Sequence, residues 1–152
     1  MKPEARKILT EELNNLKERV IQNHLSAGQK ASGRTIKAFS VDVDDNSGTL
    51  YGRKFVGTLE TGRKPGRVPK NFRAIIEQWA KDKGITIEKP KTFAYFVAKK
   101  IATEGTKLFR QGGRDDIYST EIPKTIEAIM NKLGDNYRTE IMQIYNNQKV
   151  AA

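Results

Sequence analysis

A short segment rich in glycine, proline and basic residues constrains the fold of this chain more than any other feature. From Gly62 to Lys70 two glycines and two prolines alternate with four cations, which are Arg63, Lys64, Arg67 and Lys70. Proline lacks a backbone N–H, and glycine loses more conformational freedom on folding than other residues do. The segment therefore cannot form the interior of a helix or of a central strand. We expect an exposed basic loop at about residues 60–71, held between two ordered elements.

Long apolar stripes near the two ends of the chain predict two long amphipathic helices. The first helix is expected from Pro3 to about Gly28, with proline in its first turn and glycine at its exit. Its apolar face is formed by Leu9, Leu13, Leu16 and Val20. The second helix is expected from Ser119 onward, with Pro123 in its first turn. Its apolar face is formed by Ile122, Ile126, Ile129, Leu133, Tyr137, Ile141 and Ile144.

Between these helices, alternating apolar and polar residues predict a β-hairpin. Phe39, Val41 and Val43 alternate with polar residues, and turn-forming residues follow from Asp44 to Gly48. An extended pattern then resumes and is expected to continue as a strand into residues 59–60, immediately before the basic loop.

Two shorter helices are expected after the basic loop. The spacing of apolar residues predicts one helix after Asn71, which we expect to act as its N-cap, and a second that ends at Gly105. Extended backbone is expected at 85–87 and a mobile loop at 105–118. The predicted fold class is α+β, with a small antiparallel sheet, two long terminal amphipathic helices and two shorter helices. A chain of 152 residues fits one domain, so we predict a single domain over 1–152.

Composition narrows the classes of function. The chain has no cysteine, which excludes a disulfide framework, a thiol nucleophile and a cysteine-based zinc site. No apolar run is long enough for a membrane span, and the first residues do not resemble a signal peptide, so we expect a chain that acts inside a cell or in a particle assembled there. The net charge of +10 favours anionic partners. Hydrophobic residues make up 37% of the chain, a thin core that a partner could complete.

No catalytic, cofactor or metal site is predicted. The single histidine, His24, has no cysteine partners and is expected to be structural. The acidic residues at 42–45 do not have the spacing of a calcium loop and are expected to form a solvated turn. Asp115 and Asp116 could serve a metal-assisted nuclease, but the sequence offers no third ligand, so capping or solvation is the simpler interpretation.

The basic loop leaves three interpretations open. Seven cations lie between Arg53 and Arg73 against the single acid Glu60, which makes this region the positive pole of the chain. Such a loop could contact DNA phosphates without reading sequence, as in a stand-alone DNA-binding protein. It could equally contact an acidic protein surface. The third interpretation is a solvated connector between the hairpin and the next helix.

Several phrases resemble the tail-completion, or head–tail joining, proteins of the neck of tailed bacteriophages. The phrases are FVGTLETGRKP, FRAIIEQWAKDKGI, AYFVAKKIATEGTKLF and GGRDDIY, in this order along the chain. In that family a strand ending in Leu-Glu-x-Gly opens a long loop, and a later helix carries Ala-x-x-Ile followed by Gly-Thr. The matching residues here are Leu59, Glu60, Gly62, Ala98, Ile101, Gly105 and Thr106.

The resemblance implies a non-enzymatic virion protein, assembled in the host cytoplasm and located in the neck or tail. It implies a homo-oligomeric ring, with a hexamer favoured over a dodecamer, that joins the portal to the tail proteins around the DNA channel. In such a ring the basic loop would contact a neighbouring protein or the DNA in the channel. No cofactor and no membrane contact are implied.

Overall fold

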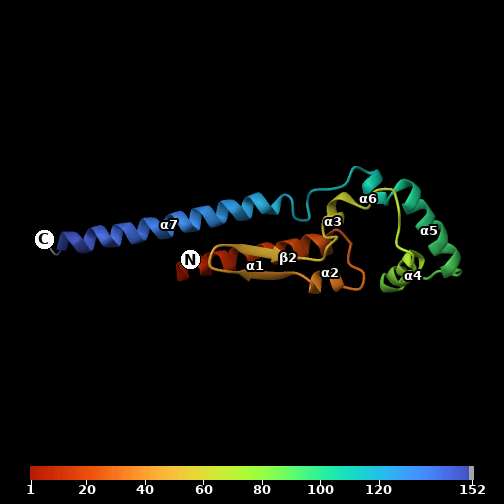
Figure 1. Ribbon diagram of the computed structural model, residues 1–152, viewed down its shortest axis with the longest axis horizontal. Coiled ribbons are helices and arrows are strands. Elements are labelled where there is room, and N and C mark those ends of the chain that lie inside the picture. The colour runs from red at the N-terminus through yellow and green to blue at the C-terminus, as the bar shows by residue number, and fades with distance from the viewer. Residues whose placement is uncertain (151–152) are drawn as a thin grey trace.

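A computed structural model describes the backbone of residues 1–150 and the side chains up to Asn147. The molecule is elongated, with its sheet and its two long helices side by side and the shorter helices at one end (Figure 1). The elements in chain order are α1 (Pro3–Ser26), α2 (Arg34–Lys37), β1 (Ser40–Val43), β2 (Gly48–Tyr51), α3 (Thr58–Thr61), α4 (Phe72–Asp82), α5 (Pro90–Glu104), α6 (Lys107–Arg110) and α7 (Glu121–Val150). This is a small α+β fold, as the sequence predicts.

The hairpin packs on α1 and forms the main core. β1 and β2 pair antiparallel, with Val41 opposite Leu50. Asp44 closes the turn, because its Oδ1 accepts the N–H groups of Asn46 at 2.7 Å and Ser47 at 2.6 Å. The apolar face of α1 meets the sheet in a cluster of buried residues, which are Leu13, Leu16, Val20, Val43 and Ile117.

α7 runs antiparallel to α1, and polar contacts join them. Lys132 lies 2.6 Å from the carboxylate of Glu12, a residue that is 5% exposed. Arg19 donates to Glu121 at 2.8 Å and to the buried hydroxyl of Thr125 at 2.7 Å. α7 continues past the N-terminus of α1, so its last turns have no α1 beside them (Figure 1).

The shorter helices form a second packing unit. α4 and α5 contact one another around Ile76, Ala94 and Ala98, which are buried. Phe72 and Ile101 pack against this cluster from its edges. Small residues on α5 allow the two helices to approach closely, so this unit has a modest apolar core of its own.

The structure corrects three local predictions. The second strand ends at Tyr51 rather than at 59–60, and Thr58–Thr61 forms the helical turn α3 because the backbone folds through turns that begin at Phe55 and Val56. Residues 85–87, expected to be extended, belong to no helix and lie outside the described sheet, which contains only β1 and β2.

The other two corrections concern helix ends. Asn71 stands at the N-terminus of α4 but its side chain makes no capping bond; instead the N–H of Phe72 bonds to the carbonyl of Pro69 at 3.1 Å. The expected loop at 105–118 contains the helical turn α6, whose N-terminus is capped by Thr106.

Candidate functional site

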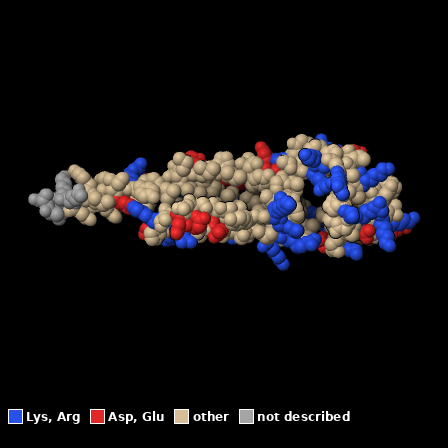
Figure 2. Space-filling model, in the orientation of Figure 1, with Lys and Arg blue, Asp and Glu red and all other residues tan. Residues whose placement is uncertain are grey.

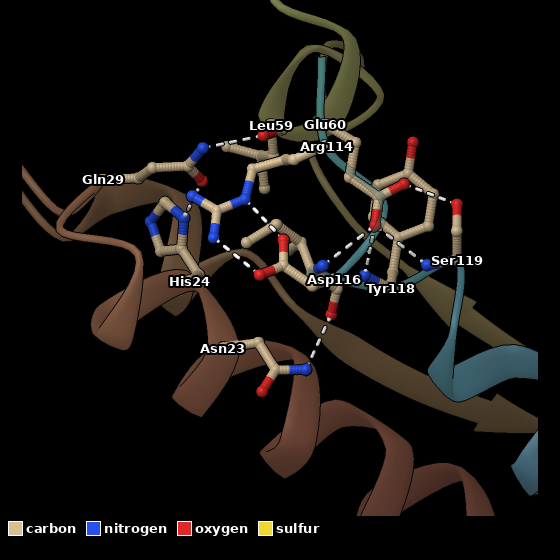
Figure 3. Close-up of polar contacts among 10 residues, drawn as sticks. Asn23, His24, Gln29, Leu59, Glu60, Arg114, Asp116, Tyr118 and Ser119 are labelled. Atoms are coloured by element: carbon tan, nitrogen blue, oxygen red, sulfur yellow. Dashed lines mark hydrogen bonds and ion pairs between the residues drawn. The ribbon is translucent and has the colours of Figure 1, made fainter. Parts of the chain in front are cut away.

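A buried carboxylate joins the segment before the basic loop to the segment that leads into α7. Glu60, on α3, is 3% exposed. Its Oε1 accepts the backbone N–H groups of Ile117 at 2.9 Å, Tyr118 at 2.7 Å and Ser119 at 2.9 Å. Its Oε2 accepts the hydroxyl of Ser119 (Figure 3). The carboxylate therefore holds three consecutive residues that lie far away in the sequence.

The electrostatics of Glu60 favour the ionised form. Burial alone raises the pKa of this carboxyl, but the hydrogen bonds from the Ser119 side chain and from three backbone N–H groups together lower it below its ordinary value. A buried charge is tolerated when every bonding position around it is used. Glu60 is thus a structural anchor. The pKa of the nearby Tyr118 hydroxyl is raised, mainly because the hydroxyl is removed from solvent and to a smaller extent because of the Glu60 charge.

Further bonds extend this anchor to the end of α1. The N–H of Arg114 bonds to the carbonyl of Glu60 at 2.9 Å. Gln29 donates to the carbonyl of Leu59 at 2.7 Å, and His24, which is 3% exposed, meets Gln29 at 3.1 Å (Figure 3). Three separate parts of the chain therefore meet here. We call the contacts of residues 59–60 with 113–119 and with Gln29 the glutamate joint.

The base of the basic loop is fixed by glycines that lie directly on α6. Gly62 has a φ of +67°, and a Cβ there would lie 2.5 Å from the N of Phe109 and 2.6 Å from the Oγ1 of Thr106. A Cβ on Gly105 would lie 2.7 Å from the carbonyl of Arg63. Only glycine permits such approaches, because any side chain would displace neighbouring backbone. The Leu-Glu-x-Gly and Gly-Thr phrases thus pack against one another.

Hydrogen bonds hold the loop in this position. The N–H of Arg63 bonds to the Thr106 hydroxyl at 2.9 Å, and the N–H of Thr106 bonds to the carbonyl of Arg63 at 2.8 Å. Further along, the N–H of Gly66 bonds to the carbonyl of Ala102 on α5 at 2.9 Å. The loop from Gly62 to Asn71 is therefore tied to α5 and α6 by its backbone, which leaves its side chains available for contacts.

The four predicted loop cations divide into one inward residue and three outward ones. Arg63 is half-buried, its Nη2 donates to the carbonyl of Arg67 at 2.8 Å, and its guanidinium lies 5.4 Å from the centre of the Phe72 ring. This side chain braces the loop. Lys64, Arg67 and Lys70 are exposed and remain candidates for contact with a partner.

The positive charge extends well beyond the loop. Residues 62–110 contain thirteen Lys and Arg against four Asp and Glu, a net +9 of the chain's +10. We call this region, the loop with α4, α5 and α6, the basic lobe. Figure 2 shows its Lys and Arg side chains gathered at the end of the molecule away from the C-terminus. Charge of one sign concentrated at one end steers anionic partners to that end.

Sequence reasoning missed a groove of the basic lobe. Lys70, Arg73 and Lys99 are among the residues that line it, and the Arg73 guanidinium lies 4.8 Å from the centre of the Tyr95 ring. Tyr95 and Lys99 are four residues apart on α5, a spacing that places both on one helix face. That spacing is the signal that could have identified this surface.

The other candidate residues are accounted for by local structure. Asp116 pairs with Arg114 at 2.8 Å, and this hydrogen-bonded partner lowers the pKa of the Asp116 carboxyl (Figure 3). Asp44 is occupied by the hairpin turn, whose backbone N–H groups lower the pKa of its carboxyl. Within residues 1–150 no group of three or more potential ligand side chains is placed to hold a metal ion.

Two further results bear on this site. In the part of the chain that the structure describes, no helix combines the length and the apolar character that a bilayer span requires. Comparison of the chain with family models, with curated proteins and with solved structures finds no match.

Proposed function

We propose that this chain is a non-enzymatic structural subunit of the bacteriophage neck, which assembles into a ring and joins the portal to the tail around the DNA channel. The basic lobe is its contact end. The ring forms from copies of this chain, with a hexamer favoured.

One observation carries the proposal. The residues on which the resemblance to neck proteins rests, Leu59-Glu60-x-Gly62 and Gly105-Thr106, are distant in sequence but meet in one structure. Glu60 anchors the start of α7, and Gly62 and Gly105 fix the loop on α6. A joint of this kind is expected in a rigid subunit whose loop must keep a fixed position relative to its neighbours.

The joint also suggests how the subunit works. Because its backbone is tied to α5 and α6, the loop presents Lys64, Arg67 and Lys70 without a large entropic cost of ordering on contact. Exposed cations of this kind suit an acidic protein surface, where they give orientation and speed of association more than affinity. They would also tolerate DNA passing through the ring.

The test is co-assembly with the proteins encoded beside this gene. The chain is co-expressed with the proteins encoded by its neighbouring genes, among which the proposal expects portal, capsid and tail proteins. Complexes are measured by mass photometry and electron microscopy. We expect rings attached to the portal or the tail. A chain that stays monomeric with all of these proteins present would contradict the proposal.

Charge reversal identifies the contact end. The variant with Lys64→Glu, Arg67→Glu and Lys70→Glu is expected to lose portal or tail association while circular dichroism stays unchanged. Its matched control reverses the same number of exposed lysines outside the basic lobe, at Lys30, Lys37 and Lys54. Equal loss in both variants would point to net charge rather than to the loop.

The net charge of +9 on the basic lobe favours one second candidate function. The chain would then be a stand-alone DNA-binding protein that does not recognise a particular base sequence. Its test is a salt titration of duplex DNA binding. Each lost phosphate contact lowers the slope of log K against log salt by about 0.9. Replacing Lys64, Arg67 and Lys70 with alanine should therefore lower the slope markedly, whereas an unchanged slope would exclude the loop.

A further inference from the structure

The C-terminal helix carries an apolar surface that its own subunit leaves uncovered. Several large apolar side chains of α7 are more than 40% exposed. Five of them recur along one side of the helix, are 43 to 67% exposed, and form what we call the α7 stripe: Ile126, Met130, Tyr137, Ile141 and Ile144. Soluble monomers rarely expose a contiguous apolar patch of more than a few hundred Å². A stripe of this extent indicates an interface.

The side of α7 that faces α1 has a different character. It is polar and already satisfied, through Arg19 with Glu121 and Thr125 and through Lys132 with Glu11 and Glu12. Lys2, the residue before α1, pairs with Glu140 and lies 5.3 Å from the centre of the Tyr137 ring, so Tyr137 is the one stripe residue for which a contact with this end of the chain is described. By helical spacing, the stripe belongs to another side of α7. The last turns of α7 continue past the N-terminus of α1 (Figure 1).

The spacing within the stripe indicates that its partner is a helix. Met130, Tyr137 and Ile144 recur every seven residues. Ile126 lies four residues before Met130, and Ile141 lies three residues before Ile144. A repeat of seven keeps one seam of a helix facing a second helix along its length. The apolar face of α1 cannot serve, because Leu13, Leu16 and Val20 are buried under the hairpin.

The area of the stripe suits a pair of identical surfaces. We take roughly 150–250 Å² as the area of each large side chain, the range known for aromatic residues. Multiplied by the exposed fractions of the five residues, this gives about 400–700 Å² of exposed apolar surface. A standard interface uses about 800 Å² per partner, a little over half of it nonpolar. One α7 stripe against another therefore reaches the nonpolar area of a stable interface without help from the rest of the chain.

We propose that the α7 stripe packs against the α7 stripe of a second copy of this chain. The choice of a second copy rests on the proposed ring. Because the same surface meets itself, the pairing closes a dimer within that ring, and the contacts between dimers use other surfaces. A glutamate at the centre of such a seam would bury an uncompensated charge and separate the copies.

The experiment compares two double variants of the full chain by analytical ultracentrifugation. Met130→Glu with Ile144→Glu places charges in the stripe, and Asn131→Glu with Asn146→Glu places the same charges at exposed positions of α7 outside it. We expect the wild type and the Asn131→Glu, Asn146→Glu variant to associate. The dissociation constant of the Met130→Glu, Ile144→Glu variant should be at least tenfold higher. Wild-type chains that stay monomeric, or stripe variants that associate like the wild type, would overturn the inference.

Cross-linking provides a readout that does not depend on the stability of the variants. Because the chain has no cysteine, Ile144→Cys and Met130→Cys each introduce a single reactive thiol. Bismaleimide should link two copies of Ile144→Cys if the helices run parallel, or Ile144→Cys to Met130→Cys if they run antiparallel. Absence of both products would contradict the pairing.

The outcomes separate this inference from the neck function. Chains that pair through α7 but ignore the portal and tail proteins would support the pairing and contradict the neck function. Chains that join those proteins in the same ring after charges enter the stripe would support the neck function and contradict the pairing.

Discussion

Replacing Glu60 with glutamine should destabilise the chain by about 3 kcal/mol, although the two side chains have nearly the same shape. Glutamine keeps an oxygen for the three N–H donors of residues 117–119, but it removes the charge. A hydrogen bond to a charged group contributes about 1 kcal/mol more than a neutral one, so three such bonds account for the predicted loss. The consequence reaches the core, because Ile117, one of the three, is fully buried.

Urea denaturation followed by circular dichroism measures this loss. With an m-value typical of small proteins, the midpoint should fall by about 1–2 M. The matched control is Glu88→Gln, an exposed glutamate of the basic lobe, which should change stability by less than about 0.5 kcal/mol. A loss below about 1 kcal/mol for Glu60→Gln would refute the anchoring role.

The pH dependence of the same comparison tests the charge itself. The folded pKa of Glu60 lies below the value of about 4.3 for an unfolded glutamate, so its stabilisation is complete above that pH and disappears as pH falls through the folded pKa. The difference between wild type and Glu60→Gln should therefore shrink below about pH 4. A difference that stays constant down to pH 2.5, or grows, would mean that the charge is not responsible.

Three further changes test the joint and the packing around it. Gly62→Ala should cost about 2–4 kcal/mol in thermal or urea unfolding, because it adds a clash to a strained φ, whereas Gly28→Ala has a similar φ and open space and should cost about 1 kcal/mol; equal losses would contradict the close approach. Arg63→Ala should destabilise by about 1 kcal/mol and Lys64→Ala by less than about 0.5 kcal/mol, and the reverse order would contradict the bracing role. Thr125→Val should cost about 1–2 kcal/mol, since it removes the buried hydroxyl that accepts from the Nη2 of Arg19, and a neutral result would argue against this contact.

Periodic patterns predicted most of the fold. The stripe with Leu13 and Val20 gave the extent of α1 within two residues, and alternation around Val41 gave the hairpin. These features depend on neighbours close in sequence, so one chain suffices to find them. The prediction of a strand at 59–60 was wrong. The apolar alternation suggested extended backbone there, but residues 58–61 form α3, in which the buried Glu60 carboxylate bonds to a distant segment.

The candidate site was predictable in composition but not in geometry. The four loop cations are visible in the sequence, yet nothing local distinguishes Arg63, which turns inward over Phe72, from Lys64, which stays exposed. Glu60 is separated by 57 residues from Ile117, so its role depends on tertiary structure alone. The one advance signal was the resemblance of Leu-Glu-x-Gly to neck proteins, which marked Glu60 without explaining it.

The mass of the particle that the chain forms with phage portal and tail proteins tests the central claim most directly. If the chain is a neck subunit, mass photometry and electron microscopy should find a closed ring with a whole number of copies, six being favoured, seated on the portal or the tail. Wild-type chains that remain monomeric, or that form particles in which the portal and tail proteins are absent, would contradict it.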